Sequence, residues 1–146
     1  MAVLLAVLVF AGGMGLGVQP TLNARLSVVT GTFWAALIST GMSALIIALV
    51  VLALRLHLPQ AEALRGLPRW AWAGGVLGAV YVTAALLAVG RLGATGVVVL
   101  AVAGQFFAAA LADHYGLFDL VRRPLDAART VGLAAILGGV VLIVSR

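Results

Sequence analysis

The sequence predicts an all-α membrane protein with five transmembrane helices. Of its 146 residues, 64% are hydrophobic and only 9% are charged, whereas a water-soluble domain has about 25% charged residues. The few charged residues leave long uncharged stretches, and a helix needs about 20 apolar residues to cross the hydrocarbon layer. These stretches are continuously apolar rather than alternating, which excludes a β-barrel.

The predicted helices follow the uncharged stretches in chain order. Their approximate spans are residues 2–24, 30–54, 69–90, 93–113 and 124–145. The fifth stretch is long enough only if its helix starts at Pro124, and proline suits the first turn of a helix. Arg129 then lies inside this helix, close enough to its end for the guanidinium to reach the lipid headgroups. The first stretch has no preceding positive charge and is too long for the apolar part of a signal peptide, so we expect it to remain as a helix.

The connections between these helices are short, so we expect residues 1–146 to form a single transmembrane domain. We find no internal repeat. Many transporters consist of two inverted halves that enclose a substrate site near the middle of the membrane. A five-helix chain resembles one such half, and an antiparallel dimer would supply the other half of a ten-helix, inverted-repeat assembly.

The net charge of +5 arises from nine basic residues, all of them arginine. Five crossings place the two termini on opposite sides of the membrane. The arginines on the N-terminal side would be Arg55, Arg65, Arg69, Arg122, Arg123 and Arg129, and those on the C-terminal side Arg25, Arg91 and Arg146. This excess weakly favours an N-in, C-out orientation and leaves dual topology open. Arginines at helix ends contact lipid headgroups, so we expect membrane lipids rather than nucleic acid as partners.

Polar residues beside a proline make the first predicted helix a candidate for a functional site. Pro20 lacks an N–H and should free the carbonyl of Leu16. Gln19 and Asn23 lie on one helical face at positions i and i+4. Interrupted helices with polar groups line many transporter sites, so we expect both residues to bind substrate. The alternative is a packing kink whose two amides form hydrogen bonds with neighbouring helices.

The fourth predicted helix contains one polar residue near its middle, Gln105. An amide in hydrocarbon needs hydrogen-bond partners, so we expect Gln105 to face protein or a water-filled cavity. Asp113 and His114 follow near the membrane interface and are candidates for a proton or charge relay. Successive helical positions do not share a face. The alternative is that Asp113 pairs with an arginine such as Arg122 or Arg123.

Ser39 and Tyr81, on the second and third predicted helices, are further candidates for substrate binding. This expectation is weaker for hydroxyl groups, because Ser and Thr in membrane helices usually bond to the carbonyl four residues earlier. Small residues predict close helix packing or kinks. The candidates for that role are Gly13, Gly17, Pro20, Gly74, Gly78 and Gly104.

Several classes of protein lack support in the sequence. No charged residue lies in the middle of a predicted helix, so there is no buried carboxylate of the kind that small multidrug exporters use to exchange protons for cationic drugs. The chain has no cysteine, and it has no HExxH, GxSxG or P-loop motif. We therefore expect no enzymatic activity, no metal site and no cofactor.

Three stretches of the sequence are similar to one family. They are QPTLNARL at 19–26, WAWAGGVLGAVYV at 70–82, and residues 104–143, in which GQ is followed eight residues later by DHYG. They resemble the YdcZ-like family of bacterial inner-membrane proteins, within the drug/metabolite transporter superfamily. The resemblance implies five-helix subunits that pair antiparallel, either as two copies or with a homologous, oppositely oriented subunit. The functional residues that it implies are Gln19, Asn23, Gln105, Asp113 and His114.

Together these patterns predict a transporter that moves a small metabolite across the inner membrane by alternating access. Gln19, Asn23 and Gln105 would line a cavity at the midplane. A passive channel is one alternative, although it needs a continuous polar stripe or ring of ligands. A membrane assembly or accessory protein without transport is another; the stripes of small residues favour it, but it does not explain the polar residues beside Pro20.

Overall fold

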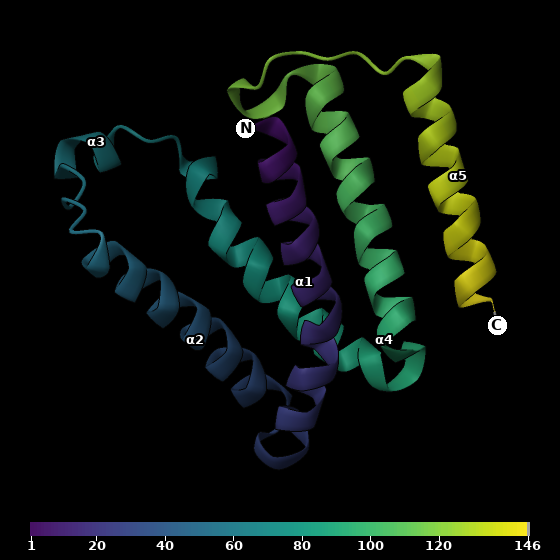
Figure 1. Ribbon diagram of the computed structural model, residues 1–146, viewed down its shortest axis with the longest axis horizontal. Helices are drawn as coiled ribbons and strands as arrows, with labels where there is room; N and C mark the ends of the chain where they lie inside the picture. The colour runs from purple at the N-terminus through teal and green to yellow at the C-terminus, as the bar shows by residue number, and fades with distance from the viewer. Residues whose placement is uncertain (146) are drawn as a thin grey trace. The chain divides into compact units, whose positions relative to one another are not determined.

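The computed structural model describes residues 1–145, and these are helical almost throughout, without a β-strand. Figure 1 labels the α-helices along the chain. In order the elements are α1 (Ala2–Thr30), α2 (Thr32–Ala53), α3 (Ala61–Arg65), the 3₁₀ turn η1 (Arg69–Trp72), α4 (Ala73–Tyr115), the 3₁₀ turn η2 (Leu117–Asp119) and α5 (Ala127–Val144). The all-α prediction is confirmed.

Four helical segments are long and apolar enough to cross a membrane. They are Ala2–Thr30, Thr32–Ala53, Arg69–Tyr115 and Ala127–Val144. The third contains 47 residues, more than twice the about 20 that one crossing needs. Within it Gly93 has φ 67 and ψ 167, a conformation that glycine adopts readily because it has no Cβ. The helical path of α4 is therefore broken at the place where the sequence predicted the third and fourth spans to meet.

Two helix ends differ from the expected ones for local reasons. α1 continues through Arg25, because a charged side chain leaves the backbone hydrogen bonds of a helix intact, and the chain breaks at Gly31 (φ 83) instead. α5 begins after Asp126 rather than at Pro124. The carboxylate Oδ1 of Asp126 accepts a hydrogen bond from the N–H of Arg129 at 2.7 Å, which is how an aspartate caps a helix N-terminus.

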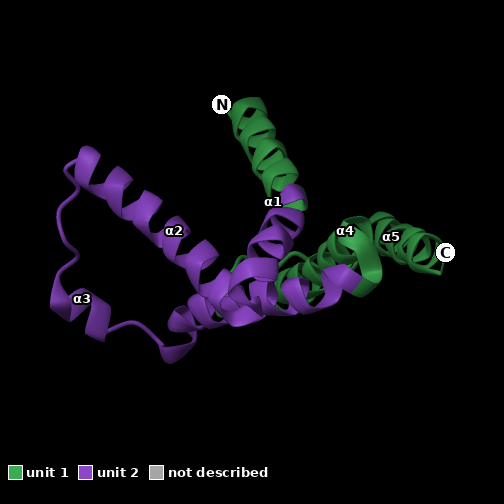
Figure 2. Cartoon of the chain, turned by 90° about the horizontal axis from the view of Figure 1, so that it is seen from below, with its two compact units in different colours: residues 1–17, 91–146 green, residues 18–90 purple. Residues whose placement is uncertain are grey.

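The helices group into two compact units (Figure 2). Unit 1 contains residues 1–17 and 91–146, and unit 2 contains residues 18–90. In unit 1, α5 lies beside the part of α4 that follows Gly93 (Figures 1 and 2).

Unit 2 has a small apolar core where α1, α2 and α4 meet. Its members are Ala35, Ala36, Val82 and Leu86, with Leu26 and Tyr81 packed against them. Small side chains such as alanine allow helices to approach closely without a large core. The hydroxyls of Thr40 and Thr83 each donate to the carbonyl four residues earlier, at 2.8 Å, which is the bonding expected of such residues in membrane helices.

Most large apolar side chains of residues 1–145 are exposed, and none of them is fully buried. Water-soluble monomers rarely expose apolar patches of more than a few hundred Å². Helices with such surfaces are suited to the hydrocarbon of a membrane. Their outer side chains are apolar, and their backbone N–H and C=O groups form hydrogen bonds within the helix. The fold is thus that of a multi-pass membrane protein.

Candidate functional site

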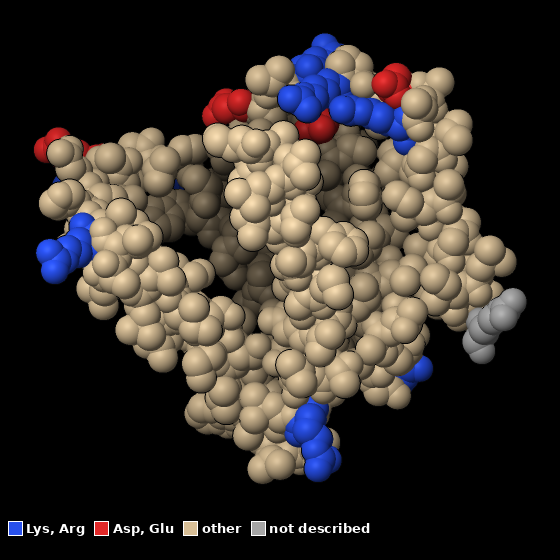
Figure 3. Space-filling model, viewed as in Figure 1, with Lys and Arg blue, Asp and Glu red and all other residues tan. Residues whose placement is uncertain are grey.

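Among the described residues of unit 1, the charged side chains other than Arg91 gather at one end, where α4 stops and α5 starts (Figure 3). α4 ends at Tyr115 because Gly116 takes the left-handed conformation with φ 65 and ψ 38. A Cβ at this position would lie 3.2 Å from the carbonyl oxygen of Leu120 and 3.4 Å from the Cβ of Arg122. Glycine therefore permits the tight turn by which the chain leaves α4.

The segment after Gly116 folds back over the end of α4 through three hydrogen bonds. The N–H of Arg123 donates to the carbonyl of Asp113 at 2.7 Å, and Nε of Arg122 donates to the carbonyl of His114 at 3.0 Å. The N–H of Leu125 donates to Nδ1 of His114, also at 3.0 Å. The first two bonds satisfy carbonyls that the last turn of a helix leaves without partners.

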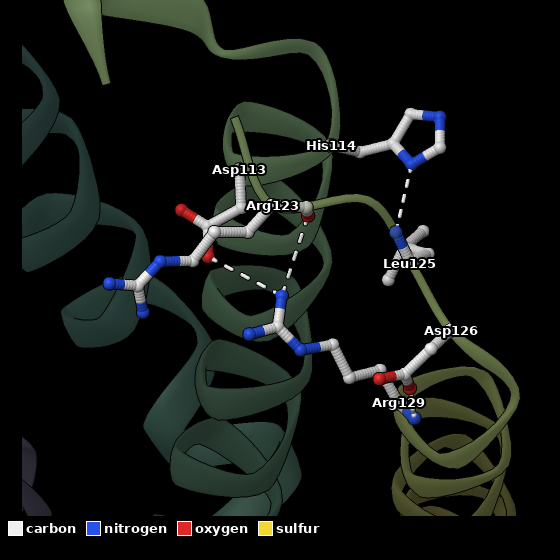
Figure 4. A network of polar contacts seen from close by, with 6 residues as sticks. All are labelled: Asp113, His114, Arg123, Leu125, Asp126 and Arg129. Atoms are coloured by element: carbon white, nitrogen blue, oxygen red, sulfur yellow. Dashed lines mark hydrogen bonds and ion pairs between the residues drawn. The ribbon is translucent and has the colours of Figure 1, made fainter. Parts of the chain in front are cut away.

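The imidazole of His114 has a structural role in this turn, visible in Figure 4. Because Nδ1 accepts the hydrogen bond from Leu125, the neutral ring has its proton on Nε2. His114 thereby fixes the position of the chain just before α5 begins.

Asp113 pairs with Arg129 rather than with Arg122 or Arg123, the partners considered from the sequence. Nη1 of Arg129 lies 3.8 Å from Oδ2 of Asp113, and these side chains are 42% and 39% exposed. The same Nη1 lies 3.5 Å from the carbonyl oxygen of Arg123 (Figure 4). Asp113 and His114 thus contact different partners, in keeping with successive helical positions that do not share a face.

A pocket of about 380 Å³ lies between α4 and α5 next to this ion pair. We call it the α4–α5 pocket. Its charged lining residues are Asp113 and Arg129, and the rest of its lining is Phe106, Ala109, Ala110, Leu125, Gly132, Leu133 and Ile136. On both helices the lining positions follow the spacing i, i+3, i+4, i+7 of one helical face. The pocket is therefore a mainly apolar slot with one acidic and one basic group at one end.

The residues predicted on the first helix lie in unit 2. Asn23 is 8% exposed and is the buried polar residue among residues 1–145. Gln19 is half-buried, and Pro20 is buried within α1, which is helical on both sides of it. Ser39 and Tyr81 are half-buried in the same unit, and Tyr81 packs against its apolar core.

Gln105 lies in unit 1, beside the pocket rather than in its lining. It directly precedes Phe106 on α4, and its side chain is exposed. The structure therefore brings Asp113 to the α4–α5 pocket and His114 next to it, but it does not bring Gln105 there.

The small residues expected at close helix contacts have free space around them. A Cβ built at Gly13, Gly17, Gly74, Gly78 or Gly104 would meet no atom within 4 Å. Close packing at these glycines stays a prediction. Within residues 1–145 no three His, Asp or Glu side chains are grouped so that they could hold a metal ion.

Sequence reasoning missed the second half of the pocket. Arg129 was interpreted as a residue that reaches the headgroups, although Gly132, Leu133 and Ile136 follow it at helical spacing. The same spacing joins Phe106 to Asp113. On each of two consecutive helices, one charged residue lies on the same helical face as a row of apolar residues. This pattern could have indicated from the sequence that the two faces form a pocket with both charges at one end.

These features define a multi-pass membrane protein of helical hairpins, with a ligand-sized pocket next to an ion pair. A family model described as "Putative inner membrane exporter, YdcZ" matches residues 4–142. The chain belongs to this family, as the resemblance of its sequence indicated. It is accordingly a multi-pass protein of the inner membrane and a member of an exporter family, and export is not an enzymatic activity. No curated protein and no solved structure matches the chain.

Proposed function

We propose that this protein exports a small molecule by alternating access, as an antiparallel dimer of two five-crossing subunits. The segment Arg69–Tyr115 would cross the membrane twice, with Gly93 at the turn between the crossings. Its length supports this, because 47 residues exceed what a single crossing accommodates. Two subunits inserted in opposite orientations would provide the inverted repeat on which many transporters are built.

The observation that supports transport most directly is the α4–α5 pocket. Pockets for small ligands have volumes of roughly 300–1,000 Å³ and combine apolar walls with a few polar groups. The pocket of about 380 Å³ fits this description, with Asp113 and Arg129 as the charged groups. Its lining lacks the continuous polar stripe that a water-filled channel needs, which favours a carrier over a channel.

Gln19, Asn23 and Gln105 would line the transport pathway at the midplane, as the sequence predicts. The burial of Asn23 supports this proposal, because it keeps a polar side chain away from lipid. Gln105 is exposed in the single chain, so its amide would need a partner from a second subunit, a ligand or water. An amide in the middle of a span needs a partner in protein or water, since hydrocarbon offers none.

Asp113 and His114 would relay a proton or compensate the charge of the cargo. Asp113 is 39% exposed at the mouth of the α4–α5 pocket, so that a ligand or water can reach its carboxylate. The Nε2–H of His114 is available for proton transfer, because its Nδ1 already accepts the hydrogen bond from Leu125.

Efflux from proteoliposomes tests this function. Vesicles with the purified protein would be loaded with a broad panel of metabolites, and the loss of each would be compared with that from protein-free vesicles. Ile136→Trp should fill the pocket and lower the efflux rate at least about tenfold, whereas Ile47→Trp, on an exposed site of α2, should not. Equal rates with and without protein for every metabolite would contradict transport. Currents too large for conformational cycling would indicate a channel.

A further inference from the structure

The α4–α5 pocket places two opposite charges at one end of an apolar slot, and this combination restricts the chemistry of its ligand. Asp113 and Arg129 are one acid and one base, so the pocket has no net charge from its lining. A ligand with a single charge would pair with one of them and leave the other without a partner. Each side chain is about two-fifths exposed, so water lessens the cost of leaving one unpaired, but a ligand that pairs with both gains one more charge-assisted contact than a singly charged ligand.

The ion pair is open enough to admit a ligand. The 3.8 Å between Nη1 of Arg129 and Oδ2 of Asp113 exceeds the about 2.7–2.9 Å of a charge-assisted hydrogen bond. Each side chain is about two-fifths exposed. A ligand with both an ammonium group and an anionic group can therefore give each of these side chains a shorter contact than they give each other.

The two helices favour one orientation of such a ligand. Asp113 lies in the last turn of α4 and Arg129 in the first turn of α5. The C-terminal end of a helix has a partial negative charge and the N-terminal end a partial positive charge. An ammonium group is thus favoured beside Asp113, and an anionic group beside Arg129.

The apolar part of the slot extends away from the charges. Phe106 lies seven residues before Asp113, and Ile136 seven residues after Arg129, which is about 10 Å along each helix at 1.5 Å per residue. Leu133 and the alanines of α4 line the space between. A ligand held by its charges at the mouth would extend its apolar part toward Phe106 and Ile136.

We propose that the α4–α5 pocket binds a zwitterion with an apolar body, its ammonium group at Asp113 and its anionic oxygen group at Arg129. The inference rests on the proposed function, because it names the class of molecule that the exporter would move. Two sources share this chemistry. One is a free amino acid with an apolar side chain, and the other is a lipid with a phosphoethanolamine headgroup.

Binding measurements on the full chain in nanodiscs of phosphatidylglycerol, a lipid that has no ammonium group, test the proposal. The probes are phenylalanine, phenethylamine, which lacks the carboxylate, and 3-phenylpropionate, which lacks the ammonium group. Titration calorimetry should give a Kd for phenylalanine at least about tenfold lower than for either analogue, since each loses a charge-assisted contact. Equal affinity of a singly charged analogue would overturn the proposal.

Matched variants locate the site. Arg129→Gln and Asp113→Asn should each weaken phenylalanine binding by about tenfold or more, and Ile136→Trp should weaken it while leaving both charges in place. Arg65→Gln, on the exposed short helix α3, is the control and should bind as the unchanged chain does. Unchanged affinity in all three pocket variants would place the ligand elsewhere and overturn the assignment.

A second arm distinguishes the lipid source. Phosphatidylethanolamine would be added to the nanodiscs, and the lipid retained by the protein measured by native mass spectrometry. Retention by the unchanged chain and loss in Arg129→Gln, without binding of phenylalanine, would identify the zwitterion as a lipid. Binding of neither phenylalanine nor phosphatidylethanolamine would overturn the inference.

These outcomes separate the inference from the proposed function. If a metabolite leaves proteoliposomes through a pathway that Ile136→Trp blocks, yet no zwitterion binds, the substrate class is wrong and the exporter remains. If phenylalanine binds as expected but no metabolite is released, the site is supported and export is contradicted.

Discussion

Gln105 is a polar residue in a membrane-spanning helix, and no neighbouring residue among residues 1–145 accounts for its amide. It is exposed on α4 and does not line the α4–α5 pocket. A polar group at such a position costs free energy unless protein, ligand or water satisfies it. We have assigned it to the transport pathway.

Replacement of this amide tests that assignment. Gln105→Ala should lower efflux by up to about tenfold, because one uncharged hydrogen bond contributes about 0.5–1.5 kcal/mol. Efflux would be measured for whichever metabolite the proteoliposome panel identifies. Gln60→Ala removes the same side chain from the segment before α3 and should have no effect. If the two variants transport equally well, Gln105 is not part of the pathway.

His114 allows its structural and chemical roles to be separated. Its Nδ1 accepts the hydrogen bond from Leu125, and the side-chain oxygen of asparagine can accept a bond from nearly the same position. His114→Ala should lower the free energy of unfolding by about 1 kcal/mol, whereas His114→Asn should retain it. Both variants should also slow efflux at least about tenfold if His114 relays protons, since neither replacement side chain can pass on a proton. Efflux at the unchanged rate for His114→Asn would leave His114 with the structural role alone.

The partner of Asp113 shows why the site could be predicted only in part. Sequence reasoning identified Asp113 as a residue that either relays charge or pairs with an arginine. Three arginines closely follow Asp113 in the sequence, at 122, 123 and 129, and their spacing alone does not show which of them pairs with its carboxylate. The choice of Arg129 depends on the turn at Gly116 and on the capping of α5 by Asp126, both of which are set by backbone conformation.

At the scale of elements, the helices themselves were predictable because apolar, uncharged stretches have few alternatives in a membrane. Their ends were less so. Hydropathy does not record a positive φ, so the break at Gly31 and the extension of α1 through Arg25 were missed. The break at Gly93 lies where the sequence predicted the third and fourth helices to meet, because Arg91 interrupts the apolar stretch there.

The turn after α4 makes a testable contribution to stability. Gly116→Ala should destabilise the protein by about 1–2 kcal/mol, the cost of a left-handed conformation for a residue with a Cβ. The contacts that the new Cβ would make with Leu120 and Arg122 would add to this cost. Thermal unfolding in detergent, followed by circular dichroism, would measure the change. Gly138→Ala on α5 has free space around it and should not lower the stability; equal effects of both substitutions would show that the turn is not constrained as described.

At the scale of the whole molecule, hydropathy alone predicted a chain of membrane-spanning helices, and the structure has four segments long and apolar enough to cross. The predicted count of five crossings depends on the proposal that Arg69–Tyr115 crosses twice. The division into two compact units was not predicted, because it depends on which helices pack together rather than on where they occur. The apolar exterior of the chain agrees with a subunit that contacts lipid or a second subunit. Antiparallel pairing would supply the second half of the transporter.

The orientation of the chain in intact cells tests this pairing most directly. The protein has no cysteine, so Gln60→Cys and Ser145→Cys each introduce a unique label site for a membrane-impermeant maleimide. The five crossings that we propose would place these two sites on opposite sides of the membrane. If the chain pairs with an inverted copy of itself, each site should be labelled in part, with the remainder labelled only after permeabilisation. Complete labelling at Ser145 and none at Gln60 would show one fixed orientation and contradict self-pairing, so that an oppositely oriented homologous subunit would have to complete the transporter.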